Sequence, residues 1–392
     1  MQLISLGFGG YQALKIQQQS GEIKNLPRLH FNESASVLSA VAALDDTIGQ
    51  GEVVQAIDRL KLKTQLTNHT LLPWANAVYT LKQCQQYIFP NIQSEKIKVW
   101  LTDFIATHDN QLPMLDLALA LASKVNGVSR LHSRIALGKF KEKYPQITEM
   151  PSVTNGVDLK RWAPTFTKFL QEKGLIDEYE LPTVDYKTQV DQLSSQELWT
   201  LKQEKKQTMR EYLRTRKDQY DQAIALDDNA IVATFAHRFV DYKRPDLLFR
   251  EIASLRKLLQ DNPNLHIMMA GKIHPNNIAG KDKLCALLAR IDSEGLGNRI
   301  YWVQDYDVQL WQRLVVGSDI WLNTPKRGEE ACGTSGMKAQ MNGAILVSTA
   351  DSYTDEMSSI PNQLRFATLS LELVENYRSL KLIVLLCKNQ GF

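Results

Sequence analysis

Residues 329–338 read Glu329-Glu330-Ala331-Cys332-Gly333-Thr334-Ser335-Gly336-Met337-Lys338, and an apolar run follows at 344–349. The small residues predict a short helix that ends at the pair Asn342-Gly343, because such a pair readily takes the left-handed conformation that stops a helix. We expect Lys338 in about the first turn of this helix, beside unpaired backbone amides that can bind an anion. An ordinary glycine-rich loop with a surface lysine explains this stretch alone equally well.

The composition is that of a globular protein of about two or three domains. Of 392 residues, 44% are hydrophobic and 23% are charged, and 46 Lys and Arg face 43 Asp and Glu, for a formal net charge of +3. This balance argues against a nucleic-acid partner or a membrane surface. The four cysteines, Cys84, Cys285, Cys332 and Cys387, show neither metal-ligand spacing nor a disulfide framework. No secretory leader or membrane span is recognised, so we expect a cytoplasmic protein without a bound metal.

Strand-like and helical segments alternate along the chain on both sides of a charged, mostly helical connector at 159–222. In the first half a glycine-rich turn is expected at 1–10, strands at 27–31 and 62–66, and helices at 34–44, 75–88 and 112–124. In the second half strands are expected at 230–235, 265–269, 299–303, 319–322 and 344–348, and helices at 246–259, 281–291 and 308–316. This alternation predicts an α/β protein with two doubly wound domains that face one another across a cleft, at 1–157 and 158–392.

Polar residues follow nearly every predicted strand, where ligands bind in open α/β sheets. The second half contributes basic and tyrosine residues and the first half His, Asn and Glu. They are Arg238, Tyr242, Lys243, Arg244, Lys272, Tyr306, Lys326 and Arg327, then His30, Asn32, Glu33, His69 and Asn155. One cleft that collects them suits a phosphate beside a hydroxylated sugar. Taken singly, Arg238 and Lys243 can be surface charges, His69 a core histidine, and the tyrosines packing residues.

These motifs resemble the α-glucan (glycogen and starch) phosphorylases, which are retaining glycosyltransferases of the GT-B architecture that carry pyridoxal phosphate. The resemblance covers about residues 7–351 and rests on five motifs in the same order. They are Thr67-Asn68-His69-Thr70 with Leu72-Pro73, Val125-Asn126-Gly127-Val128 with His132-Ser133, Thr154-Asn155-Gly156-Val157 with Arg161-Trp162, Arg238 with Tyr242-Lys243-Arg244, and Glu330 to Lys338 with Asn342-Gly343-Ala344.

The resemblance implies that the chain cleaves terminal α-1,4-glucosidic bonds of a glucan or maltooligosaccharide with inorganic phosphate and releases glucose 1-phosphate. Lys338 is expected to hold pyridoxal phosphate as a Schiff base, with Gly333, Thr334 and Ser335 at the cofactor phosphate and Tyr306 nearby. Arg238 and Lys243 are expected to bind the substrate phosphate. The glucosyl side is expected to involve Asn32, Glu33, His69, Asn155, Glu330, Cys332 and Gly333. A homo-oligomer is compatible with these expectations.

Two alternatives stay open. Nucleotide-sugar glucosyltransferases such as glycogen or starch synthases share the fold, but they have two glutamates separated by seven residues. Here residues 331–337 separate Glu330 from Lys338, so a lysine stands where the second glutamate is expected. The other alternative is a truncated, non-catalytic relic, because the first glycine-rich loop of the family is not found upstream of Gly7 and residues 352–392 depart from its pattern. His237 also stands where a more basic residue is common, and Gly336 where some members have Asn.

Overall fold

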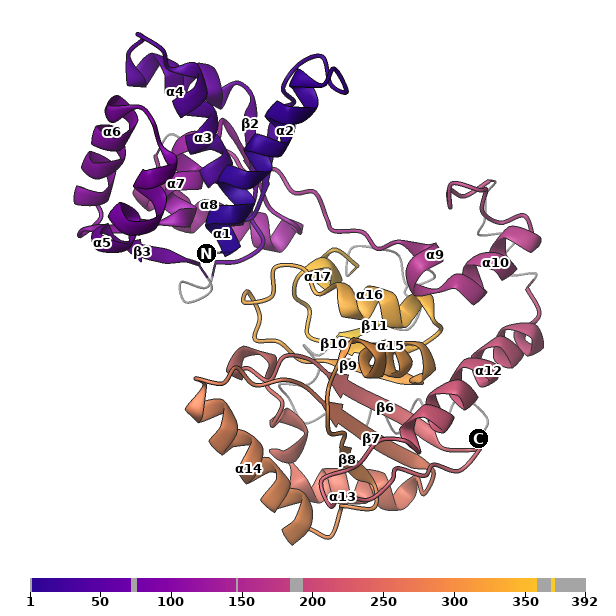
Figure 1. Ribbon diagram of the computed structural model, residues 1–392. Coiled ribbons are helices and arrows are strands. Elements are labelled where there is room, and N and C mark those ends of the chain that lie inside the picture. The colour runs from indigo at the N-terminus through magenta and orange to yellow at the C-terminus, as the bar shows by residue number, and fades with distance from the viewer. Residues whose placement is uncertain (1, 72–75, 146, 184–192, 358–367, 371–392) are drawn as a thin grey trace. The chain divides into compact units, whose positions relative to one another are not determined.

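The computed structural model describes residues 2–71, 76–145, 147–183, 193–357 and the backbone of 368–370 (Figure 1). Its contacts divide the chain into two compact units, Met1–Thr154 and Asn155–Phe392. Both units are mixed α/β structures built on parallel sheets, as the alternating pattern predicts. No helix among the described residues is long and apolar enough to cross a lipid bilayer.

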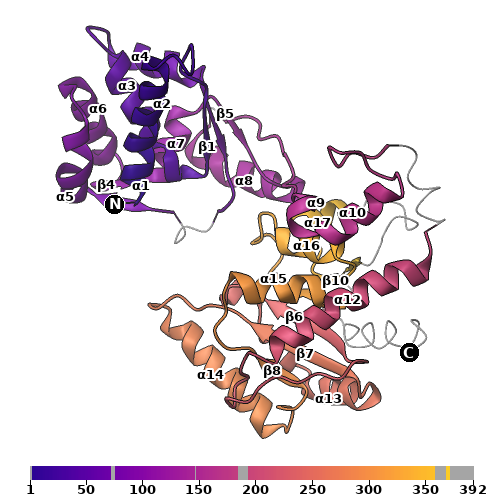
Figure 2. The same ribbon diagram turned by 45° about the vertical axis from the view of Figure 1, so that its right-hand side comes forward.

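The first unit contains a three-stranded parallel sheet in the order β1-β2-β5. These strands are β1 (Leu29–Asn32), β2 (Thr64–Thr67) and β5 (Lys124–Asn126), and an antiparallel pair is formed by β3 (Val78–Thr80) and β4 (Gln111–Pro113). Helices surround the strands (Figure 2): α1 (Gln2–Ile4), α2 (Gly10–Gln19), α3 (Leu38–Thr47), α4 (Val53–Lys61), α5 (Leu81–Gln83), α6 (Glu95–Ala106), α7 (Met114–Leu121) and α8 (Arg130–Lys143). The first seven residues of α3 are buried, so α3 is the central helix of this core.

The glycine-rich turn predicted at residues 1–10 is wrong, because this segment is helical. A π-helical stretch, Ser5–Gly9, joins α1 to α2. A Cβ atom at Gly7 would lie 2.4 Å from the Cβ of Leu38. Gly7 therefore allows two helices to pack closely, and it does not reverse the chain. The helix predicted at 112–124 is also shorter than expected, since its first residues form β4 and the helix itself is α7.

The second unit contains a six-stranded parallel sheet in the order β11-β10-β9-β6-β7-β8. From β6 the chain adds strands first toward one edge of the sheet and then toward the other, as in a doubly wound fold. The strands are β6 (Ile231–Ala236), β7 (Leu265–Ala270), β8 (Ile300–Trp302), β9 (Ile320–Asn323), β10 (Ile345–Ser348) and β11 (Thr368–Ser370). All five strands predicted in this half are present. They are almost entirely buried, as expected of strands covered on both faces.

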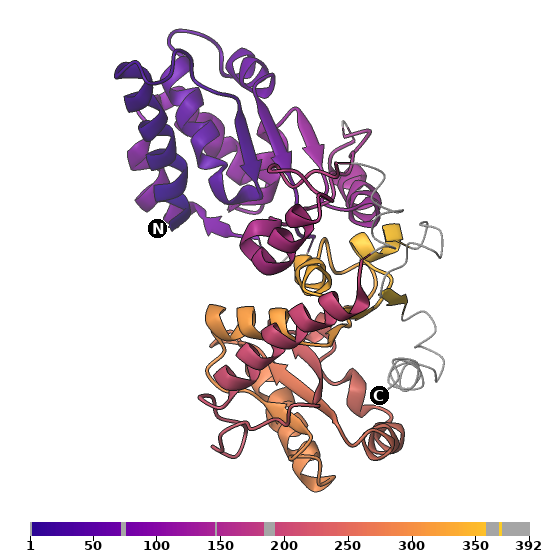
Figure 3. The ribbon, with the colours of Figure 1, turned by 90° about the vertical axis from the view of Figure 1, so that its right-hand side faces the viewer.

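Helices cover both faces of this sheet (Figure 3). The helices α12 (Ser195–Leu213), α15 (Val308–Gly317) and α16 (Thr334–Met341) pack on one face, and α13 (Ile252–Asp261) and α14 (Ile278–Ser293) pack on the other. The remaining helices of the unit are α9 (Leu159–Trp162), α10 (Pro164–Glu172) and α17 (Tyr353–Met357). The carboxyl ends of β6, β9 and β10 therefore lie side by side at one edge of the sheet.

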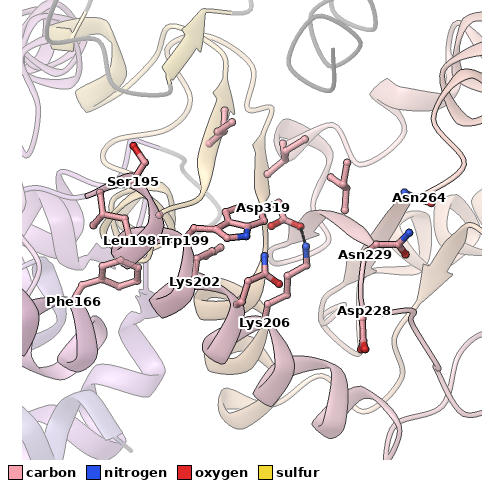
Figure 4. Close-up of a pocket in the computed structure, with 15 residues that line it drawn as sticks. Phe166, Ser195, Leu198, Trp199, Lys202, Lys206, Asp228, Asn229, Asn264 and Asp319 are labelled. Carbon is pink, nitrogen blue, oxygen red and sulfur yellow. Dashed lines mark ion pairs between the residues drawn. The ribbon is translucent and has the colours of Figure 1, made fainter. Parts of the chain in front are cut away.

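The charged connector is less solvated than its composition indicates, because two of its lysines are buried. Lys202 donates hydrogen bonds to the carbonyl oxygens of Val316 (3.2 Å), Ser318 (2.6 Å) and Asn342 (2.9 Å), at the carboxyl ends of α15 and α16. Lys206 forms an ion pair of 2.7 Å with Asp319. Both lysines line a cavity of about 690 Å³ at the amino ends of β6, β9 and β10 (Figure 4). This cavity contains none of the predicted site residues.

Candidate active site

Lys338 lies on α16 between β9 and β10, with Gly343 at a φ of +74° as the Asn-Gly pair predicts. It is the fifth of the eight residues of α16, however, so our placement in about the first turn is wrong. Its Nζ atom lies over the ring of Trp162, 4.1 Å from the centroid, and 5.1 Å from the ring centroid of Trp311. Burial and the nearby charge of Arg161 lower the pKa of Lys338. In the described part of the chain, this amine has no carboxylate partner.

The amino end of α16 contains Gly333, Thr334 and Ser335, as predicted. The N–H of Gly333 donates to the hydroxyl of Ser352 (3.1 Å), and the N–H of Thr334 donates to the carbonyl oxygen of Cys332 (3.1 Å). The Cys332 sulfur accepts hydrogen bonds from the backbone N–H of Asn155 and from the Ser352 side chain, and burial raises the pKa of this thiol to about 11. The structure therefore brings Asn155, Cys332 and Gly333 together, which the sequence proposed as parts of one site.

Lys243 and Glu330 form a buried ion pair whose side chains are 7% and 12% exposed. Lys243 belongs to a 3-10 turn, Asp241–Lys243, after β6, and Arg244 follows it in the left-handed conformation with a φ of +50°. The Arg244 side chain donates to the carbonyl oxygens of Thr324 (2.8 Å) and Pro325 (3.0 Å), so it ties this turn to the end of β9. The loop geometry thus places one predicted phosphate ligand against one predicted sugar ligand.

Two other predicted residues differ in their surroundings. Arg238 is exposed, and its Nη2 atom donates a hydrogen bond of 3.5 Å to the hydroxyl of Tyr242. Tyr306 is partly buried against the core beneath α15 and α16, and burial raises its pKa to about 12. Arg238 is therefore available to a ligand, whereas Tyr306 also has the packing role that we considered for it.

His237, which departs from the family pattern, is a buried structural histidine. Its side chain lies among the aromatic rings of Phe235 and Trp321, and its Nε2 atom is 2.8 Å from the carbonyl oxygen of Leu322. Burial lowers the pKa of His237 to about 3, so the imidazole is neutral at neutral pH. His237 therefore adds no positive charge beside Arg238, Lys243 and Arg244, the cations that follow β6.

Asp351 was missed by the sequence reasoning. Its carboxylate is 1% exposed and accepts hydrogen bonds from the backbone N–H groups of Gly328 (3.0 Å), Glu330 (3.1 Å) and Ser352 (2.7 Å). It therefore holds the loop that carries Glu330. Burial raises the pKa of Asp351 to about 6. An aspartate that follows the apolar strand β10 was the available signal, because polar groups after parallel strands gather at one edge of the sheet.

Gly336 departs from the family pattern for a local steric reason. A Cβ atom there would lie 2.5 Å from the hydroxyl oxygen of Tyr353 and 3.1 Å from a methyl group of Leu346. Tyr353 is buried and donates to the Gln340 side chain (3.2 Å). The tyrosine hydroxyl thus occupies the space into which a larger residue at position 336 would extend.

Gly336→Ala is expected to destabilise the second unit by about 1–3 kcal/mol, because the methyl group forces a shift in a packed core. Chemical unfolding followed by tryptophan fluorescence measures this change. Adding Tyr353→Phe is expected to recover part of the loss, since it removes the nearest atom. Gly138→Ala on α8 is the matched control, because its Cβ would meet nothing within 4 Å. It should stabilise the protein by up to about 1 kcal/mol. Equal destabilisation by both alanines would contradict the steric explanation.

In the first unit, Asn32 is the last residue of β1, Glu33 follows it directly, and His69 follows β2 at the same carboxyl edge of the sheet. The N–H of His69 donates to the Glu33 carboxylate (2.5 Å), and Glu33 has a φ of +64°. The hydroxyl of Thr67 donates to the side-chain oxygen of Asn126 (2.8 Å) and lies 2.6 Å from His30 Nε2. Asn32 is exposed. A network of polar side chains therefore joins all three strand ends.

Four polar atoms of this edge are buried without a hydrogen-bond partner among the described residues. They are Glu33 Oε2, Asn68 Oδ1, His69 Nδ1 and His132 Nε2. Buried polar atoms are normally satisfied, so these atoms favour a ligand or water at this edge. Burial raises the pKa of Glu33 to about 7 and lowers the pKa of His69, and it lowers the pKa of His132 to about 4. The result is a polar surface with weak charge, which suits hydroxyl groups.

The contribution of Glu33 to the stability of the first unit is expected to fall as the pH rises from about 4.5 to about 7, by as much as about 3 kcal/mol, while the lowered pKa values of His69 and His132 contribute the opposite trend. Glu33 keeps its proton in the folded state over this range, whereas the unfolded chain loses it, so the folded state is favoured at the lower pH. Urea unfolding at several pH values measures the slope. Glu33→Gln should remove this contribution, so that the stability of the variant rises more with pH than that of the parent chain, while Glu142→Gln at an exposed position of α8 should leave the slope unchanged. A slope that Glu33→Gln leaves unchanged would assign the effect to another group.

The two sets of residues belong to different units, so the cleft expected between the halves stays a prediction. Leu72 and Pro73 of the first motif and Cys387 lie outside the described residues, as do 358–367 and 371–392 of the segment that departs from the family pattern.

Comparisons with known proteins identify the family of the chain. The carbohydrate phosphorylase family profile matches residues 51–360. The chain is 28% identical to a glycogen phosphorylase of Mycobacterium tuberculosis (strain ATCC 25618 / H37Rv), over 91% of the chain and 44% of the relative. It is 32% identical to a glycogen phosphorylase of Aquifex aeolicus, over 70% of the chain and 42% of the relative. It is 27% identical to a maltodextrin phosphorylase of Thermococcus litoralis, over 90% of the chain and 43% of the relative. The chain thus spans less than half the length of these relatives, and it belongs to the carbohydrate phosphorylase family.

Proposed function

We propose that this chain carries the catalytic residues for reversible phosphorolysis of terminal α-1,4-glucosidic bonds, with α-glucose 1-phosphate as product and retention of configuration. The observation that carries the proposal is Lys338, an amine of lowered pKa held over two indole rings without a carboxylate partner among the described residues. A surface lysine on a loop would be solvated. This lysine is suited to react with an aldehyde, because a lowered pKa leaves more of the amine neutral.

The residues around Lys338 fit pyridoxal phosphate. The indoles of Trp162 and Trp311 form apolar walls beside the amine. Gly333, Thr334 and Ser335 would hold the cofactor phosphate at the amino end of α16, where backbone amides favour an anion. When bound, the cofactor supplies a 5′-phosphate whose second pKa of about 6 suits proton exchange with inorganic phosphate.

Lys243 and Arg238 would bind the substrate phosphate. The Lys243 ammonium has three N–H donors, and among the described residues its one carboxylate partner is Glu330, so it can bind a phosphate oxygen while it keeps this ion pair. Asp351 would keep Glu330 in place through the loop amides. A phosphate held in this way can donate its proton to the glycosidic oxygen and then attack the sugar from the same face, so that no pair of glycosidase carboxylates is required.

On the glucosyl side, we assign sugar hydroxyl contacts to His69, Glu33 and Asn32 of the first unit and to Asn155, Cys332, Gly333 and Glu330 of the second. The buried atoms Glu33 Oε2 and His69 Nδ1, which have no hydrogen-bond partner among the described residues, support this assignment, because a polyol offers both donors and acceptors.

The described cysteines, Cys84, Cys285 and Cys332, are free, which supports action in a reducing cytoplasm.

Incubation of the purified protein with a maltooligosaccharide and inorganic phosphate should release glucose 1-phosphate. A parallel reaction with nucleotide-glucose as donor separates the alternatives. Chain elongation from that donor alone would identify a nucleotide-sugar glucosyltransferase. Cofactor bound to Lys338 without product from either reaction would identify a non-catalytic relic.

A further inference from the structure

A second cavity of the carboxyl-terminal unit lies between α9, α12 and α15 and encloses about 450 Å³. The lining residues of α12 are Lys205, Thr208 and Tyr212, and those of α15 are at 309, 312, 313 and 316. These spacings of three and four residues place each set on one face of its helix. We call this cavity the Arg161 pocket, after the residue that α9 contributes. It shares no lining residue with the site formed by Arg238, Lys243 and Glu330.

The charged side chains found in the lining of the Arg161 pocket are basic. Arg161, Lys205 and Arg313 line it, and none of the described lining residues has a carboxylate. Within the described ranges, none of the three cations forms an ion pair. The acidic residues Glu204 and Glu211 of α12 lie outside the lining, although α12 carries both signs of charge. Three uncompensated cations around one cavity create a local positive potential that attracts an anion.

Two of the three cations are held in place by aromatic rings. The guanidinium of Arg161 lies 5.4 Å from the ring centroid of Trp162, and that of Arg313 lies 5.8 Å from the ring centroid of Tyr212. Such contacts restrict an arginine and leave its N–H donors free for a second partner. The cavity thus presents oriented donors, and it also contains Thr208 and two glutamines as neutral donors and acceptors.

We propose that the Arg161 pocket binds a phosphate group, as inorganic phosphate or as the ester of a small hydroxylated molecule. An arginine can donate two parallel hydrogen bonds to two oxygens of one phosphate, and a lysine adds a single positive charge. The cavity is larger than one phosphate ion, and its neutral amides and hydroxyl suit the polyol part of an ester. Trp162 connects this site with Lys338, because the same ring carries both Arg161 and the Lys338 amine. The proposal does not depend on phosphorolysis.

Chemical protection of Lys205 tests the proposal on the intact chain. The amines are acetylated with and without inorganic phosphate at constant ionic strength, and modification is measured by peptide mass spectrometry. At ten times the dissociation constant, phosphate should slow the modification of Lys205 by about tenfold. Lys281, an exposed lysine of α14, should react at an unchanged rate. No protection of Lys205, or equal protection by chloride, would refute the proposal. The same experiment with glucose 1-phosphate distinguishes the free ion from the ester. The preferred ligand is the one that protects Lys205 at the lower concentration.

Variants locate the bound anion. Arg161→Gln combined with Arg313→Gln should raise the phosphate concentration needed to protect Lys205 by roughly tenfold or more, since both charge-assisted contacts are lost. Lys281→Gln, which removes the same type of charge elsewhere, should leave that concentration unchanged. Arg238→Gln should also leave it unchanged, even though it removes a proposed substrate contact. Loss of Lys205 protection in Arg238→Gln would show that the anion binds at the other site and would overturn the proposal. Unfolding curves verify that each variant is folded.

Discussion

Lys338→Ala is expected to abolish covalent retention of pyridoxal phosphate and to reduce phosphorolysis by several orders of magnitude. In the proposed function this amine reacts with the cofactor aldehyde, and its position over Trp162 keeps it poorly solvated. Borohydride reduction of the loaded protein, followed by peptide mass spectrometry, should place the label on Lys338 in the parent chain and nowhere in the variant.

Lys338→Arg separates covalent attachment from positive charge. It keeps a cation over the indole rings but supplies no primary amine, so it should also lack the label. Lys139→Ala on α8 removes an exposed lysine and should retain the label in full. Label on another lysine, or undiminished label in Lys338→Ala, would refute the assignment. If the parent chain is labelled on Lys338 but has no phosphorolysis activity, Lys338 is the cofactor-binding residue and the chain is a non-catalytic relic.

Lys243→Met is expected to lower the free energy of unfolding by about 3–5 kcal/mol, because it leaves the Glu330 carboxylate buried without its partner. The two side chains are 7% and 12% exposed, so water cannot replace the lost ammonium effectively. Phosphorolysis should fall by about 10²–10³-fold as well, since a cation near the reacting phosphate is lost. Denaturant unfolding and the rate of glucose 1-phosphate release measure the two effects.

A double variant separates stability from catalysis. Lys243→Met with Glu330→Leu removes both charges and should recover most of the stability, because a buried ion pair is often replaceable by apolar residues. Its activity should stay as low as that of the single variant. Lys257→Met on α13 is the control, since it breaks the exposed ion pair with Asp261 and should cost less than about 1 kcal/mol without loss of activity. Recovered activity in the double variant would exclude a catalytic role for the pair.

The sequence predicted the second unit better than the first. Each strand of the second sheet is a buried apolar run followed by polar residues, so the local pattern already separated strands from helices. In the first unit, the glycines at 7, 9 and 10 suggested a turn, yet the segment is helical. Glycine serves there to bring one helix against Leu38. Gly7 and Leu38 are 31 residues apart, so their contact cannot be predicted from the pattern of neighbouring residues.

The sequence alone determined the parallel α/β architecture of the second unit, the strand ends at which the polar residues gather, and the lysine between β9 and β10. These follow from local periodicity and from chemistry at fixed spacing. Only the tertiary structure decided the partners: Lys338 lies over Trp162, Lys243 is paired with Glu330 across 87 residues, and Asp351 holds the Glu330 loop. These contacts join residues far apart in the chain. Their burial, charge state and spare hydrogen-bonding capacity exist only when the sheet brings its strand ends to one edge.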